Sequence, residues 1–458
     1  MTAIKALLQH IETVRYADLP PQTIAAAKTF IFDSIAVGIS GSRVPTVSQV
    51  KQAASNWGDA KQAQVWATGE WLPAGNAALV NGFQIHNQEW DAVHEKAVVH
   101  PMATILSALT SYAQQHNLSG EQLILGIVVA VDVATCIGSA VTSGLKFFRP
   151  SMCGALGVTA GICAMQQFKG DVLANAMGIS YSQLSGTMQA HVEGSGMLAM
   201  QIGINARSAM HAVDLAQAGF SGPKDILEGP FGYFRLFEDT HDIDLFYQRL
   251  GKQFQIERVS HKPFPTGRAG HGCIDGLLTL QQQHGFSSEQ IQHIHVLAPP
   301  LIMRLVGRPL KANMDSSYAK LCQGYIAAIA LQNGDVGVED FSAQALTNPD
   351  TLALAAKVSM QLNDCQDPNA LAPVRVEVTL TDGRFLHIDL PAVLGHPDRP
   401  LSKEQQVKKF WAACRSAIYP FSDDAISKLI NAIDELEQIS NINNLVQLMI
   451  YTESRGIL

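Results

Sequence analysis

The stretch Asn81-Gly-Phe-Gln-Ile-His-Asn-Gln-Glu-Trp-Asp-Ala-Val-His-Glu-Lys-Ala-Val-Val-His-Pro101 lies between two apolar, helix-like segments. It contains three histidines and three carboxylates: His86, His94, His100, Glu89, Asp91 and Glu95. The 3.6-residue apolar period stops inside it and resumes after Pro101, a residue preorganised for the first position of a helix. So many titratable groups cost stability unless they are paired or used. The pattern therefore favours an acid/base or metal site over a solvated surface loop.

Helical patterns surround this stretch on both sides and return near the end of the chain. They are expected at residues 2–17, 21–42, 76–85, 103–115, 121–142, 154–165 and 197–218, and again at 402–418, 423–437 and 441–449. Two stretches, 146–154 and 189–196, are interpreted as irregular because of their prolines and glycines. The last helices are too few to form a domain alone. We therefore expect them to pack on the N-terminal helices.

The middle of the chain has a different character. Residues 294–297 and 358–362 alternate between apolar and polar side chains. The clearest alternation covers Val374 to Leu380 and residues 384–390, on either side of Asp382-Gly383. An Asp-Gly pair between two alternating runs is the strongest short-range signal for a hairpin. Helical stretches near 270–284 and 317–333 accompany these strands, so a small α/β unit is expected after a mostly helical one.

Composition limits the classes of protein to which the chain can belong. The 458 residues are 47% hydrophobic but only 16% charged, below the usual quarter, which favours burial against a second subunit. A net charge of −8 makes nucleic acid and anionic membranes poor partners. Seven cysteines without a C-x-x-C pair, and a start unlike a signal peptide, indicate a cytoplasmic protein. The apolar segment Leu123 to Val141 carries Asp132 and is expected to be a buried helix.

Six motifs occur in the order found in one known family. They are the Asn81-Gly82 to His100-Pro101 segment, Phe148-Arg-Pro-Ser151, Gly203-x-Asn-Ala-Arg207 with Ala216-x-Ala-Gly-Phe-Ser-Gly-Pro223, Lys262-Pro-Phe-Pro with His271-x3-Asp275, Ala319-Lys-Leu-Cys-Gln-Gly-Tyr325, and Gly395-His-Pro-x-x-Pro-Leu-Ser402. Over almost its whole length the chain thus resembles the MmgE/PrpD family, which contains 2-methylcitrate dehydratase, cis-aconitate decarboxylase and iminodisuccinate epimerase.

The resemblance implies a mainly α architecture with two parts. A large all-helical domain would be built from both ends of the chain, residues 1–262 and 397–458. A smaller α/β lid domain, residues 263–396, would be inserted between them. The resemblance also implies a homodimer and an enzyme that uses no metal and no organic cofactor.

Three positions depart from the family pattern. Arg149 stands where the family usually has the histidine of a His-Pro-Thr element. Leu198 falls where a lysine is usual, and Ala92 replaces a further aspartate in the acidic run. These departures leave it open whether the dehydratase or decarboxylase chemistry of the family transfers unchanged.

Dehydration, decarboxylation and epimerisation of a polycarboxylate all move a proton at a carbon beside a carboxylate. Histidine suits this step because its pKa lies near neutrality. His100 is the first candidate, with His94 and Asp91 as partners that orient it or set its charge. In the family, positions such as His271 and Tyr325 face the pocket between the domains, so both join the catalytic candidates. The alternatives are a locally bonded helix-start histidine for His100, an exposed loop for His94 and a core aromatic for Tyr325.

Carboxylate substrates favour arginine because its guanidinium pairs with them in a planar, bidentate way. Arg149 and Arg268 lie in irregular stretches that contain glycine and proline and are candidates for this role. Lys262, Glu89 and His191 complete the predicted substrate-binding set, although His191 could also lie in a surface turn.

The predicted function is that of a cofactor-independent lyase, a dehydratase or decarboxylase, which acts on a small polycarboxylate by histidine acid/base chemistry. One alternative is an epimerase or isomerase of a dicarboxylate. Another is an eroded family member that binds polycarboxylates without turnover. A metal site built from His86, His94, His100, Glu89 and Asp91 is the rival reading, but this spacing matches no ligand pattern such as H-E-x-x-H.

Overall fold

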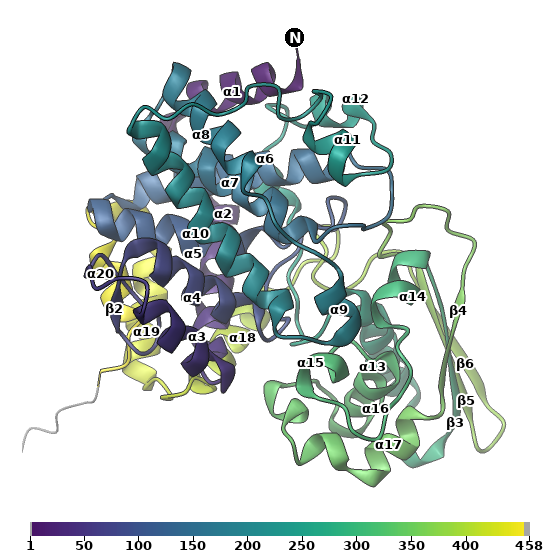
Figure 1. Cartoon of the computed structure of the whole chain (residues 1–458). Coiled ribbons are helices and arrows are strands. Elements are labelled where there is room, and N and C mark those ends of the chain that lie inside the picture. Colours follow the sequence, from purple (N-terminus) through teal and green to yellow (C-terminus); the bar gives the residue numbers. More distant parts are fainter. Residues whose placement is uncertain (1, 453–458) are drawn as a thin grey trace, which may run out of the picture.

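The computed structural model describes residues 2–452 and shows a mainly helical protein, which confirms the predicted class (Figure 1). The helices of the first half of the chain form the larger body. They are α1 (Ala3–Thr13), α2 (Pro21–Gly41), α3 (Thr46–Ser55), α4 (Ala74–His86), α5 (Pro101–His116), α6 (Gly120–Ser139), α7 (Arg149–Gln166), α8 (Gly170–Ser182), α9 (Gln189–Glu193), α10 (Met197–Gln217), α11 (Tyr233–Phe237) and α12 (Ile243–Tyr247). A two-stranded ribbon, β1 (Ala63–Gln64) with β2 (Trp71–Leu72), precedes α4.

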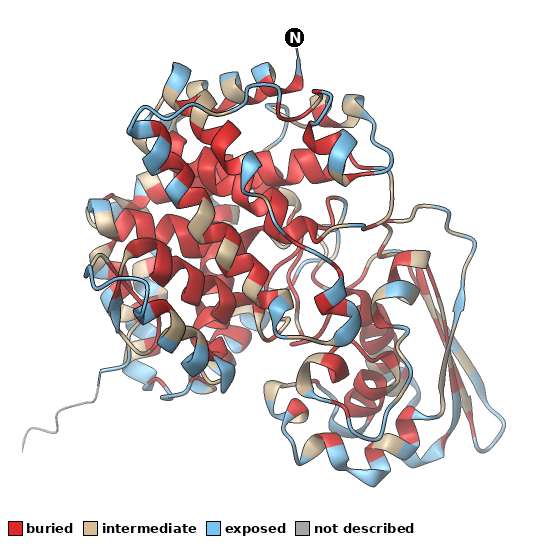
Figure 2. Ribbon diagram, in the orientation of Figure 1, coloured by how far each residue is buried: buried red, intermediate tan, exposed pale blue. Residues whose placement is uncertain are grey.

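The centre of this body is a set of apolar helices packed at close range. Helices α4, α5, α6, α7 and α10 pack against one another and are buried over most of their length (Figure 2). At Gly203 of α10, a Cβ atom would lie only 2.2 Å from the carbonyl oxygen of Leu79 in α4, so this contact requires glycine. The close packing fixes the ends of α4 and α5, between which the titratable stretch lies.

Two of these helices are long and apolar enough to cross a membrane. By length and composition α2 and α6 both pass that test, and 72% and 94% of their most apolar windows are buried inside the fold. The core helix of a globular protein has the same properties. The expected burial of Leu123 to Val141 agrees with α6, whose carboxylate Asp132 receives hydrogen bonds from the backbone nitrogen of Gln255 and from His10.

The C-terminal helices return to the N-terminal ones. They are α18 (Lys403–Arg415), α19 (Asp423–Asp434) and α20 (Asn443–Leu448). Helices α18 and α19 both pack on α2, and Ile450 pairs with Ala67 in an isolated bridge. Lys409 of α18 forms a buried ion pair of 2.6 Å with Asp33 of α2. The sequence-based expectation that these helices pack on the N-terminal ones is confirmed.

A four-stranded sheet and its helices, residues 268–390, form a separate region at the lower right of Figure 1. Its elements are α13 (His271–His284), β3 (Ile291–Ala298), α14 (Pro300–Val306), α15 (Ser316–Ala319), α16 (Gln323–Asn333), α17 (Pro349–Ala355), β4 (Val358–Leu362), β5 (Val374–Leu380) and β6 (Phe385–Leu390). The strand order is β4-β3-β5-β6, in which only β3 and β4 are parallel. The predicted hairpin is confirmed, with Val376 opposite Ile388 in the β5–β6 register. We call this segment the sheet region.

Local predictions were wrong in two stretches. Helix α7 begins at Arg149, within the stretch expected to be irregular, because Pro150 occupies the first turn, where its missing N–H is no loss. Residues 189–193 form the short helix α9, which ends at Gly194 in the left-handed conformation. The glycines and prolines there mark the ends of helices, and sequence reading took them for continuous loop.

Candidate active site

The loop between α4 and α5, residues 87–99, is held in an unusual shape. Glu89 and Val98 adopt left-handed backbone angles, with φ of 56° and 51°, which side chains other than glycine rarely accept. Val93 forms a two-bond bridge with Ser260, at 3.0 and 2.7 Å. This bridge lays the loop beside the segment that carries Lys262. The strained loop thereby brings together groups that are far apart in the sequence.

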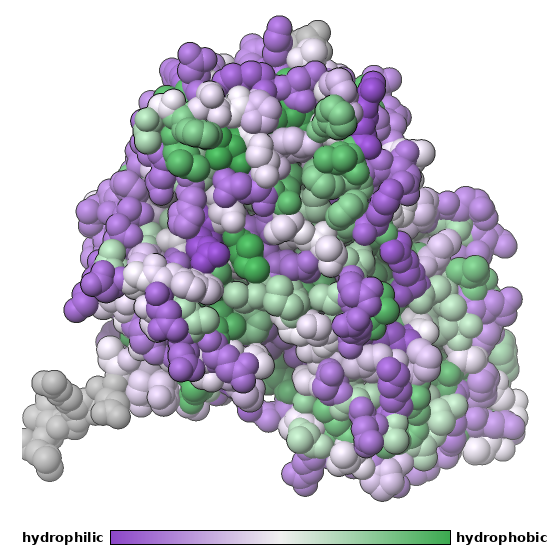
Figure 3. Space-filling model, in the orientation of Figure 1, coloured by the Kyte–Doolittle hydropathy of each residue, from purple (hydrophilic) through white to green (hydrophobic). Residues whose placement is uncertain are grey.

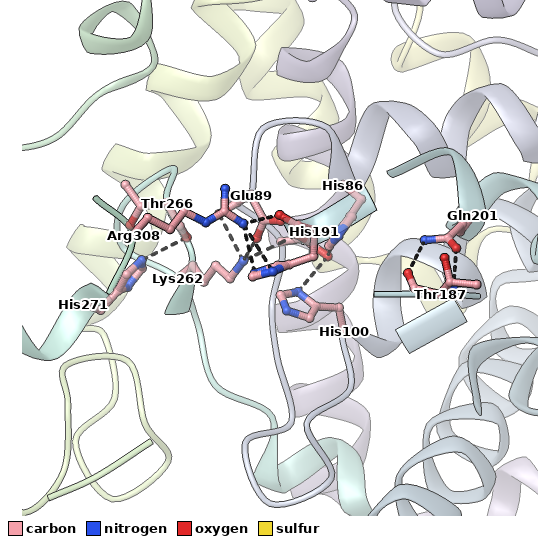
Figure 4. Close-up of polar contacts among 11 residues, drawn as sticks. His86, Glu89, His100, Thr187, His191, Gln201, Lys262, Thr266, His271 and Arg308 are labelled. Carbon is pink, nitrogen blue, oxygen red and sulfur yellow. Dashed lines mark hydrogen bonds and ion pairs between the residues drawn. The ribbon is translucent and has the colours of Figure 1, made fainter. Parts of the chain in front are cut away.

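Asp91 lies between two histidines. His86, the last residue of α4, places its Nδ1 atom 3.0 Å from Asp91, and His100, just before α5, places its Nδ1 atom 3.2 Å away. An ionised carboxylate only accepts hydrogen bonds, so each ring carries a proton on Nδ1. Both Nε2 atoms remain for chemistry, and that of His86 has no hydrogen-bond partner among the described residues. Figure 4 shows His86 and His100 together with their neighbours.

The surroundings shift the pKa values of the two histidines in opposite directions. Burial alone would lower the pKa of His86, but the carboxylates of Asp91 and Glu89 outweigh it and raise that pKa. Burial together with the Lys262 charge lowers the pKa of His100, against the pull of Asp91. His86 therefore keeps its proton to a higher pH than His100, whose ring is neutral near pH 7. Such a divergence between two neighbouring titratable groups is typical of an acid paired with a base.

An ion pair between Lys262 and Glu89 lies beside Asp91 and its two histidines. The Lys262 ammonium donates to the Glu89 carboxylate at 2.9 Å and to the Glu89 carbonyl at 3.1 Å, and lies 3.8 Å from Asp91. Although burial acts in the other direction, Lys262 and the two histidines lower the pKa of Glu89 to about 2. The same groups hold the pKa of Asp91 well below its usual range. Both carboxylates are thus ionised throughout the pH range in which histidine titrates.

Only part of the predicted metal-binding set comes together in the structure. One ligand atom each of His86, Asp91 and His100 lie within 4.8 Å of one another, so these three could hold an ion. His94 lies outside this set, and the Lys262 ammonium beside Asp91 and Glu89 opposes a divalent cation by direct repulsion. The donor set therefore fits a proton-transfer pair better than a metal site.

Two adjoining cavities meet at the histidine pair. One has an empty volume of about 500 Å³, including its mouth, and is lined by apolar side chains together with polar groups that include Lys320. The other, of about 590 Å³, is mainly apolar and includes His100 on its wall. The residues shared by both walls are His86, Glu89, His191, Leu198 and Leu321. A small molecule in the second cavity would contact both histidines, and one in the first would contact His86.

Two cations of the sheet region face this site and were missed by the sequence reading. Lys320 is buried, and among the described residues its ammonium has no hydrogen bond or ion pair, only the ring of Phe341 at 5.6 Å. Burial lowers its pKa to about 8 despite the Glu89 carboxylate nearby. Arg308 donates through Nη2 to the carbonyl of His191, while its buried Nη1 has no partner within residues 2–452 (Figure 4). The signal for Lys320 was its place directly after Ala319, in a motif already noted.

His191, a predicted substrate-binding residue, lies at the junction of the cavities. It belongs to α9. The segment before this helix is held by Gln201 of α10, which forms two hydrogen bonds with the backbone of Thr187, at 2.6 and 3.3 Å. Burial and the Arg308 charge lower the pKa of His191 to about 4, so its ring is neutral at physiological pH. The structure thus brings Asp91, His100, Glu89, Lys262 and His191 together, as the sequence predicted.

Three predicted catalytic residues have other partners. His94 hydrogen-bonds to Gln255 at 3.3 Å and accepts from the backbone of Ala97, and burial lowers its pKa to about 4, so it shapes the loop without touching His100. Tyr325 donates to the carbonyl of Asp340 inside the core of the sheet region, which is the core-aromatic alternative. His271 is buried and bonds to the carbonyl of Thr266. Among the described residues, none of the three lines either cavity.

Both arginines predicted to bind substrate are fully engaged elsewhere. Arg149 forms a buried ion pair with Glu238, at 2.9 and 3.3 Å, and donates to Asn369 and to the carbonyl of Ser143. Arg268 borders the apolar cavity, but its guanidinium pairs with Glu95 and donates to backbone carbonyls at 261, 393 and 394. Every nitrogen of the two guanidinium groups already has a partner among the described residues. These contacts favour a structural role for both arginines, and binding of a substrate carboxylate by them stays a prediction.

We expect Arg149→Met to destabilise the protein. The change leaves Glu238 buried and unpaired, and breaking such a pair costs about 3–5 kcal/mol of unfolding free energy. The double variant Arg149→Met/Glu238→Leu removes both charges and is expected to recover most of that loss. Urea unfolding followed by circular dichroism measures both. An unchanged stability in the single variant would contradict the structural role of Arg149.

Comparison with known proteins gives consistent matches over both parts of the chain. The models of the MmgE/PrpD N-terminal domain and C-terminal domain match residues 5–245 and 264–435. A cis-aconitate decarboxylase of Mus musculus is 27% identical over 93% of this chain and 89% of its own length. A cis-aconitate decarboxylase of Aspergillus terreus is 25% identical over 94% and 92%. A cis-aconitate decarboxylase-like protein of Aspergillus oryzae is 24% identical over 97% and 96%.

Proposed function

Because the chain belongs to the MmgE/PrpD family, and its relatives include cis-aconitate decarboxylases, we propose that it is a lyase acting on a small polycarboxylate without a metal or organic cofactor. The observation that carries the proposal is the His86–Asp91–His100 arrangement, in which one carboxylate holds two histidines with opposite pKa shifts beside two cavities.

In the proposed reaction, His100 is the base and His86 the acid. The Nε2 atom of neutral His100 takes a proton from the carbon beside a substrate carboxylate, and the electron pair moves into that carboxylate. In a dehydration, that pair then forms a carbon–carbon double bond as the His86 cation gives its Nε2 proton to the departing hydroxyl, which leaves as water. A decarboxylation needs no removal of a carbon-bound proton, because the electron pair left by departing carbon dioxide stays on carbon and takes the Nε2 proton of the His86 cation. Positioned proton transfer of this kind contributes roughly 10²–10⁴ to a rate.

The charge balance of the site supports a polycarboxylate. Lys262, Lys320, Arg308 and protonated His86 face the two carboxylates Glu89 and Asp91, which leaves an excess of two positive charges. Buried cations without partners are costly, and a ligand with two carboxylates would neutralise the excess. Because Lys320 and Arg308 come from the sheet region and the histidines from the helical body, we propose that the sheet region closes over the substrate as a lid.

We expect Lys320→Met to weaken substrate binding by about 10- to 100-fold, because a hydrogen bond to a charged group contributes roughly 1.5–3 kcal/mol. The change is expected in KM, with kcat much less affected, since Lys320 holds a group that does not react. Lys320→Arg, which keeps the charge, is the matched control and should retain most of the affinity. A variant with normal KM and reduced kcat would place Lys320 in the chemistry instead.

The experiment that tests the proposed function is nuclear magnetic resonance of chelator-treated protein in D2O. The ligands are 2-methylcitrate, citrate, cis-aconitate and aspartate- or succinate-like acids. Turnover, or deuterium incorporation beside a carboxylate, is expected for at least one of them and should be lost in His100→Asn. The control is His284→Asn, the same change at an exposed histidine at the end of α13. Activity that requires added divalent metal, or that survives in His100→Asn, would overturn the proposal.

An epimerase is the second candidate. Its support is the geometry of the rings, whose centroids lie 5.0 Å apart, with the Nε2 atom of His86 3.7 Å from Glu89 and without a hydrogen bond among the described residues. Epimerisation needs one group to remove a proton and another to return it. The same resonance experiment separates the two, because an epimerase exchanges the proton and inverts the carbon without losing water or carbon dioxide. Saturable binding without any exchange would instead favour a catalytically eroded member of the family.

A second copy of the chain is the proposed partner. Large apolar side chains are exposed along one part of the chain, from α9 to α11: Val192, Met197, Leu215, Phe220, Phe231 and Leu236. Figure 3 shows apolar patches on the face that carries these helices. Such patches are typical of interfaces, and the low share of charged residues agrees with a homodimer. Light scattering should give the mass of a dimer, and Phe231→Glu should lower that mass.

The seven unpaired cysteines support a reducing, cytoplasmic location.

A further inference from the structure

A third cavity borders the same loop between α4 and α5, away from the histidine pair. Its empty volume is about 760 Å³, including its mouth, and no residue lines both this cavity and either of the other two. Loop residues 94–96 form part of its wall, and the other parts come from the end of α12, from the segment 253–258 and from residue 396. Its charged and titratable residues are His94, Glu95, Lys96, Arg249, Arg258 and His396. We call it the basic cavity.

The basic cavity is positive in a chain that is negative overall. The whole sequence has 40 acidic residues against 32 lysines and arginines, whereas this wall has three such cations and a single carboxylate, that of Glu95. Glu95 is already engaged, because it forms an ion pair of 2.7 Å with Arg268. Burial lowers the pKa of His94 to about 4, and the charges of Arg249 and Arg258 act in the same direction. The field at this wall therefore favours an anion.

The cations on this wall have donors to offer. Among the described residues, the guanidinium of Arg249 makes one hydrogen bond, from Nη1 to the carbonyl of Leu245, and no ion pair. Arg258 pairs with Asp398 at 3.2 Å, and Lys96 pairs with another carboxylate at 3.0 Å, but all four side chains are partly exposed. Exposed pairs contribute little to stability, so these two cations can turn to a ligand at small cost.

His396 adds a neutral donor to the basic cavity. Its Nδ1 atom accepts a hydrogen bond of 3.1 Å from the backbone nitrogen of Asp398, and a ring nitrogen that accepts carries no proton. The neutral ring therefore has its proton on Nε2, for which residues 2–452 provide no hydrogen-bond partner. Together with Arg249, this ring supplies donors from two distant parts of the sequence, which suits a ligand with several acceptor oxygens.

The basic cavity is connected to the acid/base pair through the backbone of the loop. His94 exchanges two hydrogen bonds with Val99, at 2.8 and 3.3 Å, and Val99 directly precedes His100. The carbonyl of Glu95 accepts from the nitrogen of Val98 at 3.1 Å, which closes the left-handed turn at that residue. A ligand that holds residues 94–96 therefore also restrains the turn that positions His100.

We propose that the basic cavity binds a small oxyanion and that the bound anion stabilises the loop that carries the acid/base pair. The anion would remove the mutual repulsion of Lys96, Arg249 and Arg258, and it would join the loop to the segment after α12. Its charged group is either a phosphate or a carboxylate, since both present several acceptor oxygens to these donors. This site is separate from the proposed substrate site, and a ligand there is an effector.

Calorimetric titration of the full chain with inorganic phosphate, and separately with succinate, tests the site. Ionic strength is held constant with sodium chloride, so that general screening does not change. For at least one anion, Arg249→Gln should weaken binding about 10- to 100-fold, because a hydrogen bond to a charged group is lost. Arg249→Lys should keep most of the affinity. The matched control is Arg384→Gln, the same change at an exposed arginine in the β5–β6 turn.

The titrations also distinguish the two kinds of anion. The anion whose binding depends more strongly on Arg249 identifies phosphate or carboxylate as the group that the basic cavity takes. Equal affinities in Arg249→Gln and the wild type, for both anions, would overturn the inference. The absence of binding by both anions would overturn it as well.

Hydrogen exchange followed by mass spectrometry tests the effect on the loop. The preferred anion should slow exchange of residues 87–99 about threefold or more in the wild type, but not in Arg249→Gln. Lys320→Met should keep this protection, because Lys320 lines the polar cavity and not the basic one. Binding through Arg249 with unchanged exchange would overturn the coupling, and protection lost in Lys320→Met would place the anion in the polar cavity. Neither measurement requires turnover, so the result is independent of the proposed lyase activity.

Discussion

Replacing Asp91 by asparagine is expected to lower turnover by about 10⁴-fold, with little change in the fold. The fully buried carboxylate accepts hydrogen bonds from the Nδ1 atoms of both His86 and His100, at 3.0 and 3.2 Å. One oxygen, Oδ2, accepts from both rings, while the Lys262 ammonium lies 3.8 Å from Oδ1, so the asparagine oxygen is expected to face Lys262 and its NH₂ group the two rings. The His100 ring must then carry its proton on Nε2, where it can no longer act as a base. A loss of about 10⁴ accompanies the same exchange in a Ser-His-Asp triad.

The exchange also removes the charge that raises the pKa of His86. The acid of the pair would lose its proton near neutral pH, which adds to the effect of the wrong tautomer. Single-turnover rates in wild type and Asp91→Asn measure the loss, with circular dichroism and ligand binding as checks on the fold. The matched control is Asp367→Asn, the same change at a partly exposed carboxylate paired with Lys96. Asp91→Asn with more than a tenth of the wild-type rate would mean that Asp91 does not fix the tautomers.

Features with local causes could be read from the sequence. The β5–β6 hairpin follows from alternation around Asp382-Gly383, because strand faces and turn chemistry depend on neighbours in the chain. Helix α2 begins at Pro21 and ends at Gly41, as the proline and glycine pattern predicts. The dense titratable stretch likewise marked the site, since Glu89, Asp91 and His100 all lie within it. What this local pattern could not give was the direction of each side chain.

The roles of the arginines depended on partners distant in the chain. Arg149 pairs with Glu238, and Arg268 with Glu95, which lies 173 positions earlier. An arginine in a loop with glycine and proline looks the same in sequence whether it binds substrate or pins two segments together. The resemblance placed Arg149 at a family histidine position, but its guanidinium points toward Glu238 and forms an ion pair with it. Only the fold shows which donors are already used.

His86 shows the opposite error. In the sequence it ends an apolar helix, and it was considered only as a metal ligand, because nothing local distinguishes the acid of a pair from a buried histidine. Its assignment depends on the left-handed turn at Glu89, which brings Asp91 back to its Nδ1 atom. A non-glycine residue with positive φ cannot be inferred from residue type, so this half of the pair was out of reach of sequence reasoning.

The two histidines should also divide the pH dependence between them. The raised pKa of His86 and the lowered pKa of His100 lie on either side of the ordinary value of 6.5. Activity needs neutral His100 and protonated His86, so kcat/KM should fall below the pKa of His100 at acid pH and above that of His86 at alkaline pH. Deprotonation of Lys320, with its pKa of about 8, steepens the alkaline limb through substrate binding. The profile is a bell whose apparent pKa values belong to the interacting pair.

Asparagine variants of each histidine assign the two limbs. His100→Asn and His86→Asn each keep a donor to Asp91 in place of Nδ1, so the partner ring stays oriented while one proton-transfer group is removed. Each should lower kcat by roughly 10²–10⁴. The residual rate of His100→Asn should lose the acid limb, and that of His86→Asn should lose the alkaline limb of kcat, measured at saturating substrate so that Lys320 does not contribute. If the limbs disappeared in the reverse order, His86 would be the base and His100 the acid, and the direction of proton transfer proposed for this site would have to be exchanged.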